Sequence, residues 1–249
     1  MTIKRQEVID EGIVLKTQDY KDNDSLVTVY TKEYGKITLV ARGVKKVKSK
    51  NSPACQSLTH SEFTFIPRKG LSVLIKASSI NFYRYLKEDI ILEAYASYFL
   101  EFVYQFAGEN EPDEVMFDTL NQALKLVNEG YDYRLVYLLY NAYILKVSGA
   151  PLQVDSCVNC NHTDKIVGIS LSSGGLVCAN CIGEFDQRYD KDFLLAFRHL
   201  NKLDLNHIDM LDIKEEYLDE LTTIMDYYID EFTGLRFKTR KFINKLKKL

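Results

Sequence analysis

Short runs of apolar residues, broken by polar turns, fill the first third of the chain. The runs are rich in Val, Ile, Leu, Thr and Phe, and turn sequences such as DYKDND, KEYG and PRKG separate them. This pattern predicts short β-strands joined by tight turns. The predicted strands span residues 11–18, 25–31, 36–44, 61–67 and 71–79. Five such strands within residues 1–85 predict a small closed β-barrel of the OB type.

The longest break between these strands is RGVKKVKSKNSPACQS, residues 42–57. It is basic, polar and poor in apolar residues, which is typical of a surface loop. We therefore expect a mobile loop that projects from the barrel.

The apolar period changes to three and four residues from about residue 88. It predicts helices over residues 88–108, 111–130, 133–149, 191–202 and 214–234. Gly108, Gly130 and Gly149 stand where the first three helices should end. The predicted fold is a multidomain α+β protein, in which a helical bundle formed by residues 86–150 and 186–249 follows the barrel and residues 151–185 are inserted into the bundle.

Four of the five cysteines lie in the inserted segment as two Cys-x-x-Cys pairs, 17 residues apart. This spacing is typical of zinc sites, in which each pair forms one knuckle and the two knuckles supply four thiolates in a tetrahedron. A single iron ion fits the same shell, and a redox dithiol or two disulfides are weaker alternatives. The favoured prediction is one structural Zn²⁺ ion, held by Cys157, Cys160, Cys178 and Cys181.

His162 and Cys55 could also bind a metal, but neither is assigned to the zinc site. His162 follows the first knuckle, but four thiolates already fill the shell, so a surface histidine is expected. Cys55 stands alone in a polar stretch with no base beside it and is interpreted as an incidental thiol.

No catalytic constellation is found in the sequence. There is no phosphate-binding glycine motif, and the four histidines are scattered without metalloenzyme spacing. The acidic residues Asp19, Asp22 and Asp24 are interpreted as a solvated turn. A closed shell of four thiolates offers no open position for a catalytic metal. We expect a protein that is not an enzyme.

Charge is distributed unevenly although the net charge is only −3. Residues 1–87 carry 16 basic and eight acidic side chains, whereas residues 88–188 carry five basic and 15 acidic ones. Residues 233–249 carry seven basic and no acidic side chains. Such asymmetry predicts an interaction surface at each basic end. With no apolar stretch of about 18 residues and no signal sequence, a cytoplasmic location is expected.

The basic residues of the barrel are predicted to contact DNA. The alternative interpretation is that these residues are a solvated run of charges without a binding role. A basic loop on an OB-like barrel, however, suits a groove that follows a phosphate backbone. The predicted DNA-binding residues are Arg42, Lys45, Lys46, Lys48, Lys50, Arg68 and Lys69. Tyr20, Tyr34 and Phe65 are candidates for stacking on bases, and a place in the barrel core is the alternative for each of them. A second basic group comprises Arg236, Lys238, Arg240, Lys241, Lys245, Lys247 and Lys248.

Four segments carry a resemblance to a known family. They are GIVLKTQDYKDNDSLVTVYTKEYGKITLVARGVKK, YNAYILKVSGAPLQVDSCVNC, SLSSGGLVCANC and LRFKTRKFI. In this order, and over nearly the whole chain, they resemble the bacterial RecO family of DNA repair proteins. The resemblance covers the barrel, both knuckles and the basic C-terminal motif.

The resemblance implies a non-enzymatic recombination mediator that works at the nucleoid. Such proteins bind single- and double-stranded DNA and anneal complementary strands. They contact RecR and the single-stranded-DNA-binding protein, and they help to load the RecA recombinase at gaps. The family's DNA contact matches the basic loop at 42–50. Arg236, Lys238, Arg240 and Lys241 match a C-terminal motif that contacts DNA or a partner. The alternative is a protein-interaction adaptor in which DNA contact is incidental.

Overall fold

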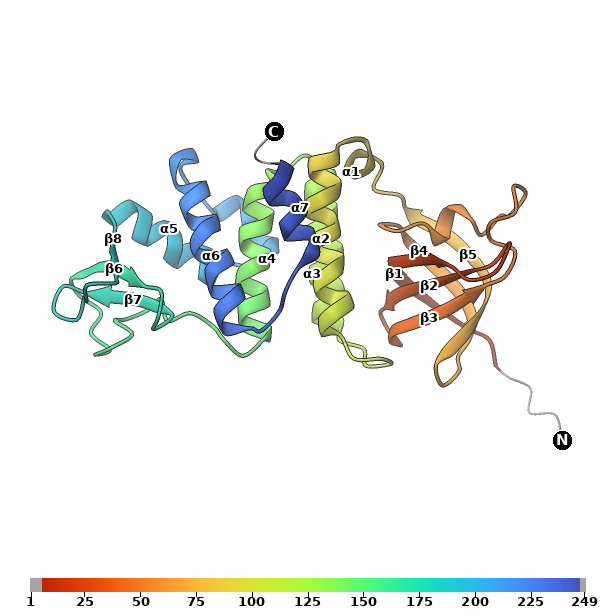
Figure 1. The fold of residues 1–249 in the computed structure, drawn as a ribbon, viewed down its shortest axis with the longest axis horizontal. Helices are drawn as coiled ribbons and strands as arrows, with labels where there is room; N and C mark the ends of the chain where they lie inside the picture. Colours follow the sequence, from red (N-terminus) through yellow and green to blue (C-terminus); the bar gives the residue numbers. More distant parts are fainter. Residues whose placement is uncertain (1–5, 247–249) are drawn as a thin grey trace. The chain divides into compact units, whose positions relative to one another are not determined.

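The computed structural model describes residues 6–246 (Figure 1). The chain divides into two compact units. The first contains the chain up to Gly130 together with the segment that starts at Phe237, and the second is Tyr131–Arg236. The second unit is therefore inserted between two parts of the first. The boundaries predicted at residues 85, 150 and 185 describe a different division and stay a prediction.

The first unit starts with a closed five-stranded barrel, which confirms the predicted OB-type fold. Its strands are β1 (Val8–Asp19), β2 (Ser25–Thr31), β3 (Gly35–Ala41), β4 (His60–Ile66) and β5 (Leu71–Asn81), paired in the order β1-β2-β3-β5-β4. β3 pairs with β5 in parallel and every other pair is antiparallel. Alternate residues of β3 point inward, so a period of two in the sequence builds one apolar core.

The segment 42–57 does not simply project from the barrel. Val44, Ala54 and Cys55 are buried and belong to the same core as the strands. The short helix η1 (Pro53–Cys55) carries two of them, and the Thr17 hydroxyl donates to the Cys55 carbonyl at 2.6 Å. The expectation of a projecting loop is wrong at both ends of the segment, because a few apolar side chains in a polar stretch are enough to anchor it.

Four helices complete the first unit: α1 (Arg84–Glu88), α2 (Ile90–Phe106), α3 (Glu114–Asn128) and α7 (Lys238–Leu246). Asp89 caps α2 by accepting the N–H groups of Ile91 and Leu92, and Asp113 caps α3. The sequence pattern predicted α2 and α3 but gave no signal for α1 or α7. Figure 1 shows α7 lying beside α2, where it packs within the same unit.

The second unit combines helices with a small sheet. Its elements are α4 (Tyr133–Val147), β6 (Ile166–Ser170), β7 (Gly175–Cys178), β8 (Gln187–Arg188), α5 (Lys191–Lys202), η2 (Leu205–Met210), η3 (Glu215–Tyr217) and α6 (Leu218–Phe232). α4 packs on α6, and the buried Tyr228 hydroxyl donates to the Ser170 carbonyl at 2.9 Å. This bond ties the helices to the sheet. Within residues 6–246, no helix has both the length and the apolar character needed to cross a membrane.

We expect the first unit to depend on Glu101, whose carboxylate on α2 serves as a distant cap for α7. It accepts the N–H groups of Lys238 at 3.0 Å and Thr239 at 2.9 Å, and the Thr239 hydroxyl at 2.6 Å. Glu101→Ala should lower the free energy of unfolding by about 1–2 kcal/mol, the usual value of a lost cap. Urea denaturation checks this value, and hydrogen exchange should show α7 opening first.

Glu184→Ala provides the matched control, because Glu184 is an exposed glutamate with no capping role. It should change stability by no more than about 0.5 kcal/mol. Equal effects of the two substitutions, or unchanged exchange in α7, would contradict a capping role for Glu101.

Candidate metal centre and nucleic-acid interface

Two tight turns place the four cysteines of residues 157–181. In the first, Asn161 adopts a left-handed backbone with φ 61° and donates its N–H to the Cys157 carbonyl at 2.8 Å. In the second, the N–H groups of Cys181 and Ile182 both reach the Cys178 carbonyl, at 3.1 and 3.0 Å. Each turn brings the two thiols of one pair to the same side. This is the geometry of a metal knuckle.

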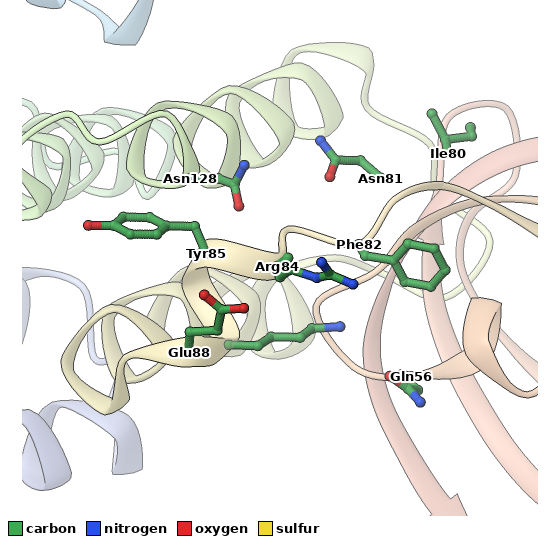
Figure 2. Close-up of a pocket in the computed structure, with 9 residues that line it drawn as sticks. Gln56, Ile80, Asn81, Phe82, Arg84, Tyr85, Glu88 and Asn128 are labelled. Carbon is green, nitrogen blue, oxygen red and sulfur yellow. The ribbon is translucent and has the colours of Figure 1, made fainter.

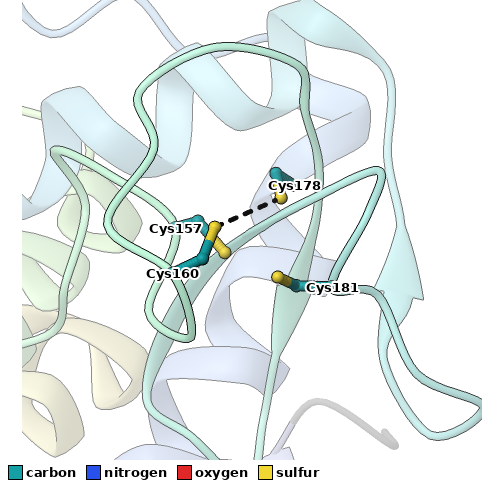
Figure 3. Close-up of side chains that lie close together, drawn as sticks. All are labelled: Cys157, Cys160, Cys178 and Cys181. Carbon is teal, nitrogen blue, oxygen red and sulfur yellow. Dashed lines mark hydrogen bonds between the residues drawn. The ribbon is translucent and has the colours of Figure 1, made fainter.

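The two knuckles face each other because the sheet connects them. β7 delivers Cys178, and the N–H of Val158 beside Cys157 donates to the Leu176 carbonyl at 2.7 Å. Gly175 is required at the start of β7, where a Cβ would lie 2.4 Å from the Gln153 carbonyl oxygen. Figure 3 shows the four side chains converging from the two turns.

The sulfur atoms have the spacing of a tetrahedral metal shell. All four Sγ atoms lie within 4.8 Å of one another, and Cys160 and Cys178 are 3.7 Å apart. A tetrahedron with metal–sulfur bonds of about 2.3 Å has edges of about 3.8 Å. All five cysteines of the chain are unbridged. The four thiols can therefore hold one metal ion in a closed shell.

The charge state of the thiols also suits a cation. Desolvation raises the pKa of Cys157, but the backbone N–H groups of Cys178, Asn159 and Cys160 outweigh it and lower that pKa to about 6. The neighbouring thiols of Cys160 and Cys178 raise the pKa of Cys181 to about 12. Four sulfurs this close repel each other as anions, and a divalent cation relieves that repulsion.

His162 lies on the surface and Cys55 lies in the barrel core. His162 is exposed, as expected, and its Nδ1 lies 3.4 Å from the Cys160 sulfur. Cys55 is not in a polar environment but in the barrel core, where burial raises the pKa of its thiol to about 12. It is therefore a core side chain.

All seven basic residues predicted to bind DNA are exposed on the barrel. The segment 42–50, which carries five of them, is fastened to the turn between β1 and β2. The Gly43 N–H donates to the Asp24 carboxylate at 2.8 Å, and the Lys45 N–H donates to the Asn23 carbonyl at 3.1 Å. The Asp24 side chain is thus a structural acceptor within the turn. The segment holds a cluster of cations in a defined position beside that turn.

Lys45 also makes an ion pair with Asp19, with the ammonium nitrogen 3.0 Å from the carboxylate. Among the described residues, Arg42, Lys46, Lys48 and Lys50 make no such pair.

Arg68 and Lys69 lie apart from this segment. They belong to the hairpin that precedes β5, and Leu71 pairs with Thr38 in the middle of β3. The segment 42–50 follows the last residue of β3. The structure therefore distributes the predicted basic residues along β3 and does not gather them in one cluster.

The three aromatic residues considered for base stacking differ in how far they are buried. Phe65 is fully buried in the barrel core, so the core alternative is correct for this residue and it is excluded as a stacking residue. Tyr34 is half-buried and packs edge-on against Phe65, with ring centroids 5.4 Å apart. Tyr20 is 44% exposed, and the Lys21 ammonium lies 5.3 Å from its ring centroid. Lys21 was not predicted as a site residue, although its position beside Tyr20 in a turn of the barrel was a usable signal.

The C-terminal basic group spans both units. Arg236 is exposed at the end of the second unit, with its guanidinium 3.7 Å from the Asp230 carboxylate. Lys238 and Lys241 are exposed on α7. Arg240 is buried on α7, and its guanidinium lies 5.8 Å from the ring centroid of Phe237. Lys245 is exposed near the end of α7, whereas Lys247 and Lys248 lie outside the described residues.

The matches to known proteins cover nearly the whole chain. Residues 4–83 match the family model "Recombination protein O N terminal", and residues 87–241 match "Recombination protein O C terminal". Three relatives named "DNA repair protein RecO" are each 32% identical and align over 96% of this chain. They come from Bacillus pumilus, over 94% of its length, Listeria monocytogenes serotype 4a, over 94%, and Halalkalibacterium halodurans, over 95%. A barrel, a helical region and a four-cysteine centre thus occur in a chain that belongs to the RecO family of DNA repair proteins.

Proposed function

We propose that this protein is a non-enzymatic recombination mediator in DNA repair, which binds single-stranded DNA on its barrel and anneals complementary strands. The observation that carries the proposal is the segment 42–50, whose exposed cations are fastened to the turn between β1 and β2. Membership of the RecO family supports the same assignment. Its proposed partners are RecR, the single-stranded-DNA-binding protein and, indirectly, RecA, at the nucleoid in the cytoplasm.

The positions of the charges agree with the way OB barrels bind oligonucleotides. These barrels use the face of strands 2 and 3 together with the loops after strands 1 and 4. Here the loop after β1 carries Tyr20 and Lys21, and the loop after β4 carries Arg68 and Lys69. The segment 42–50 follows β3 and adds five cations beside the first loop. A DNA strand that lies along β3 would meet cations at both ends of β3.

Contacts of this kind also explain annealing without catalysis. Lysine and arginine side chains that bind phosphates release condensed counterions, and such phosphate contacts do not read base edges. A strand held by its backbone keeps its bases free to pair with a complementary strand. Neutralising the phosphates also lowers the repulsion between two approaching strands.

The metal centre is assigned a structural zinc ion. The closed shell of four sulfurs leaves no position for a substrate or an activated water. A single iron ion fits the same shell, so metal analysis decides between the two. The ion would hold both knuckles of the second unit and would take no direct part in DNA binding.

The C-terminal basic residues are proposed as a contact for DNA or a partner. Arg236, Lys238 and Lys241 present charge to solvent. Arg240 serves mainly to pack α7, because it is buried against Phe237.

Reversing the charge of the segment 42–50 tests the proposed DNA contact. We expect Lys45→Glu, Lys46→Glu and Lys48→Glu together to abolish strand annealing. Fluorescence anisotropy with a labelled single strand should show weaker binding, and the log–log dependence on salt should flatten by about 2, since each lost phosphate contact contributes about 0.7.

A variant with Lys125→Glu, Lys165→Glu and Lys191→Glu is the matched control. It changes the net charge equally at three exposed lysines outside the barrel. It should bind and anneal like the unchanged protein. Equal losses in both variants, or none in the first, would reject the segment as the DNA contact. If the unchanged protein fails to bind DNA even at low salt, the adaptor function is favoured.

Removing the metal tests the structural assignment. The purified protein should contain about one zinc ion per chain by elemental analysis, and Cys178→Ser should lower that content strongly. The same substitution should lower the melting temperature of the second unit, because metal binding contributes to its folding free energy. Binding of single-stranded DNA should persist at temperatures where the second unit remains folded.

Cys55→Ser is the control for the loss of a thiol. Cys55 is the only cysteine outside the centre and lies in the barrel core. Its substitution should destabilise the barrel and leave the zinc content unchanged. Full zinc content in the Cys178→Ser variant would refute the four-thiolate site, and stoichiometric iron would replace zinc as the metal.

A further inference from the structure

Phe82 and Tyr83 connect β5 to α1, which begins with Arg84 and Tyr85, and the rings of Phe82 and Tyr85 are exposed. Tyr83 is buried, with a left-handed backbone at φ 45°, and its hydroxyl donates to the Asn121 side chain at 2.5 Å. Phe82 and Tyr85 on either side are 45% and 52% exposed. A strained backbone at a non-glycine residue persists only where its surroundings fix it, and it often marks a functional site.

Phe82, Arg84 and Tyr85 line a cavity of about 760 Å³ within the first unit. This volume lies within the range of about 300–1,000 Å³ that is typical of ligand pockets. Figure 2 shows the rings of Phe82 and Tyr85 on opposite sides of the Arg84 guanidinium. The order along the cavity is therefore aromatic, cation, aromatic.

The polar groups of the cavity include unsatisfied ones. Arg84 makes no hydrogen bond or ion pair with any described residue. Asn128 extends from α3, and its buried Oδ1 has no hydrogen-bond partner among residues 6–246. Lys87 donates to the Thr59 hydroxyl at 3.1 Å, and Glu88 is the one acidic group at the wall. A buried acceptor without a donor is costly unless a ligand or water supplies one.

We propose that this cavity binds a dinucleotide step of single-stranded DNA, so that the strand held by the barrel continues past β5 onto α1. One phosphate lies on Arg84, and the flanking bases stack on Phe82 and Tyr85. This proposal rests on the proposed function and extends its binding path beyond the predicted residues.

The chemistry of the cavity favours a nucleic acid over an acidic peptide. Alternating rings and cation match the alternation of base and phosphate along a strand, and aromatic stacking is the usual sequence-tolerant contact of single-strand binders. An acidic peptide would need more cations than Arg84 and Lys87 supply beside Glu88. β5 begins just after the Arg68–Lys69 hairpin and ends just before Phe82, so the hairpin and the cavity lie at opposite ends of one β-strand.

The absence of tryptophan from the chain permits a direct test. Phe82→Trp and Tyr85→Trp each introduce a single tryptophan, whose fluorescence a stacked base quenches. We expect saturable quenching of both variants by oligothymidylate of about 16 nucleotides, the upper site size of an OB fold. Phe185→Trp is the control, because Phe185 is 90% exposed in the second unit and should show no quenching.

Affinity measurements give a second readout. Phe82→Ala and Tyr85→Ala should each weaken binding at least about fivefold, with the salt dependence unchanged, as expected for lost stacking. Arg84→Ala should flatten the log–log salt dependence by about 0.7, as expected for one lost phosphate contact. All three side chains are exposed, and unchanged melting temperatures should show that the variants fold.

The outcomes separate this proposal from the proposed function. In one outcome, the charge reversals at Lys45, Lys46 and Lys48 abolish DNA binding, whereas the tryptophan variants show no quenching and the alanine variants bind DNA normally. The cavity is then not part of the DNA-binding path, and the proposed function of the barrel stands. If the unchanged protein does not bind the oligonucleotide at low salt, both proposals fail. Quenching by an acidic peptide but not by oligothymidylate would reassign the cavity to a protein partner.

Discussion

The docking of α7 onto α2 is the contact that holds the first unit together across an insertion. The chain leaves this unit at Gly130 and returns at Phe237, after 106 residues that form the second unit. Three hydrogen bonds to the Glu101 carboxylate and the contact between Phe237 and Tyr98, with ring centroids 4.7 Å apart, fix the return. A helix of nine residues is marginal by itself in water, so α7 depends on this docking.

The same contact decides where the C-terminal charges stand. Because α7 is held on α2, Lys238 and Lys241 belong to the same compact unit as the barrel and its basic segment. Arg236, two residues before Lys238, belongs to the second unit. A motif that is continuous in the sequence is therefore divided between the two units, and its residues need not share one role.

Elements with a clear apolar period could be predicted from the sequence, and elements that depend on distant contacts could not. The barrel strands and α2 to α6 follow such periods. α7 escaped prediction because its buried face includes Arg240, which a hydrophobic pattern counts as polar. α1 is only five residues long and follows a left-handed Tyr83, whose conformation depends on burial and on Asn121. No local pattern of residues reports either contact.

The candidate sites show the same distinction. The spacing of Cys157, Cys160, Cys178 and Cys181 predicted that their thiols would meet, because two knuckles joined by a hairpin leave few other arrangements. The sequence could have assigned Phe65 to the core, since Phe63 and Phe65 are two residues apart in a strand and share its inner face. The cavity beside Arg84 could not be predicted, because the end of β5, α1 and α3 assemble it from separate parts of the chain.

An acidic chain can bind DNA if its charges are separated by more than the range of screened electrostatics. At an ionic strength of 0.1 M this range is about 10 Å, so a phosphate responds to nearby cations and hardly to the net charge of −3. Within the basic segment the cations are not equivalent. Lys45 already has an anion in Asp19, so a phosphate at Lys45 gains less than one at Lys46 or Lys48. If DNA binds this segment as proposed, Lys45 is already paired with Asp19, and the binding energy concentrates on Lys46 and Lys48.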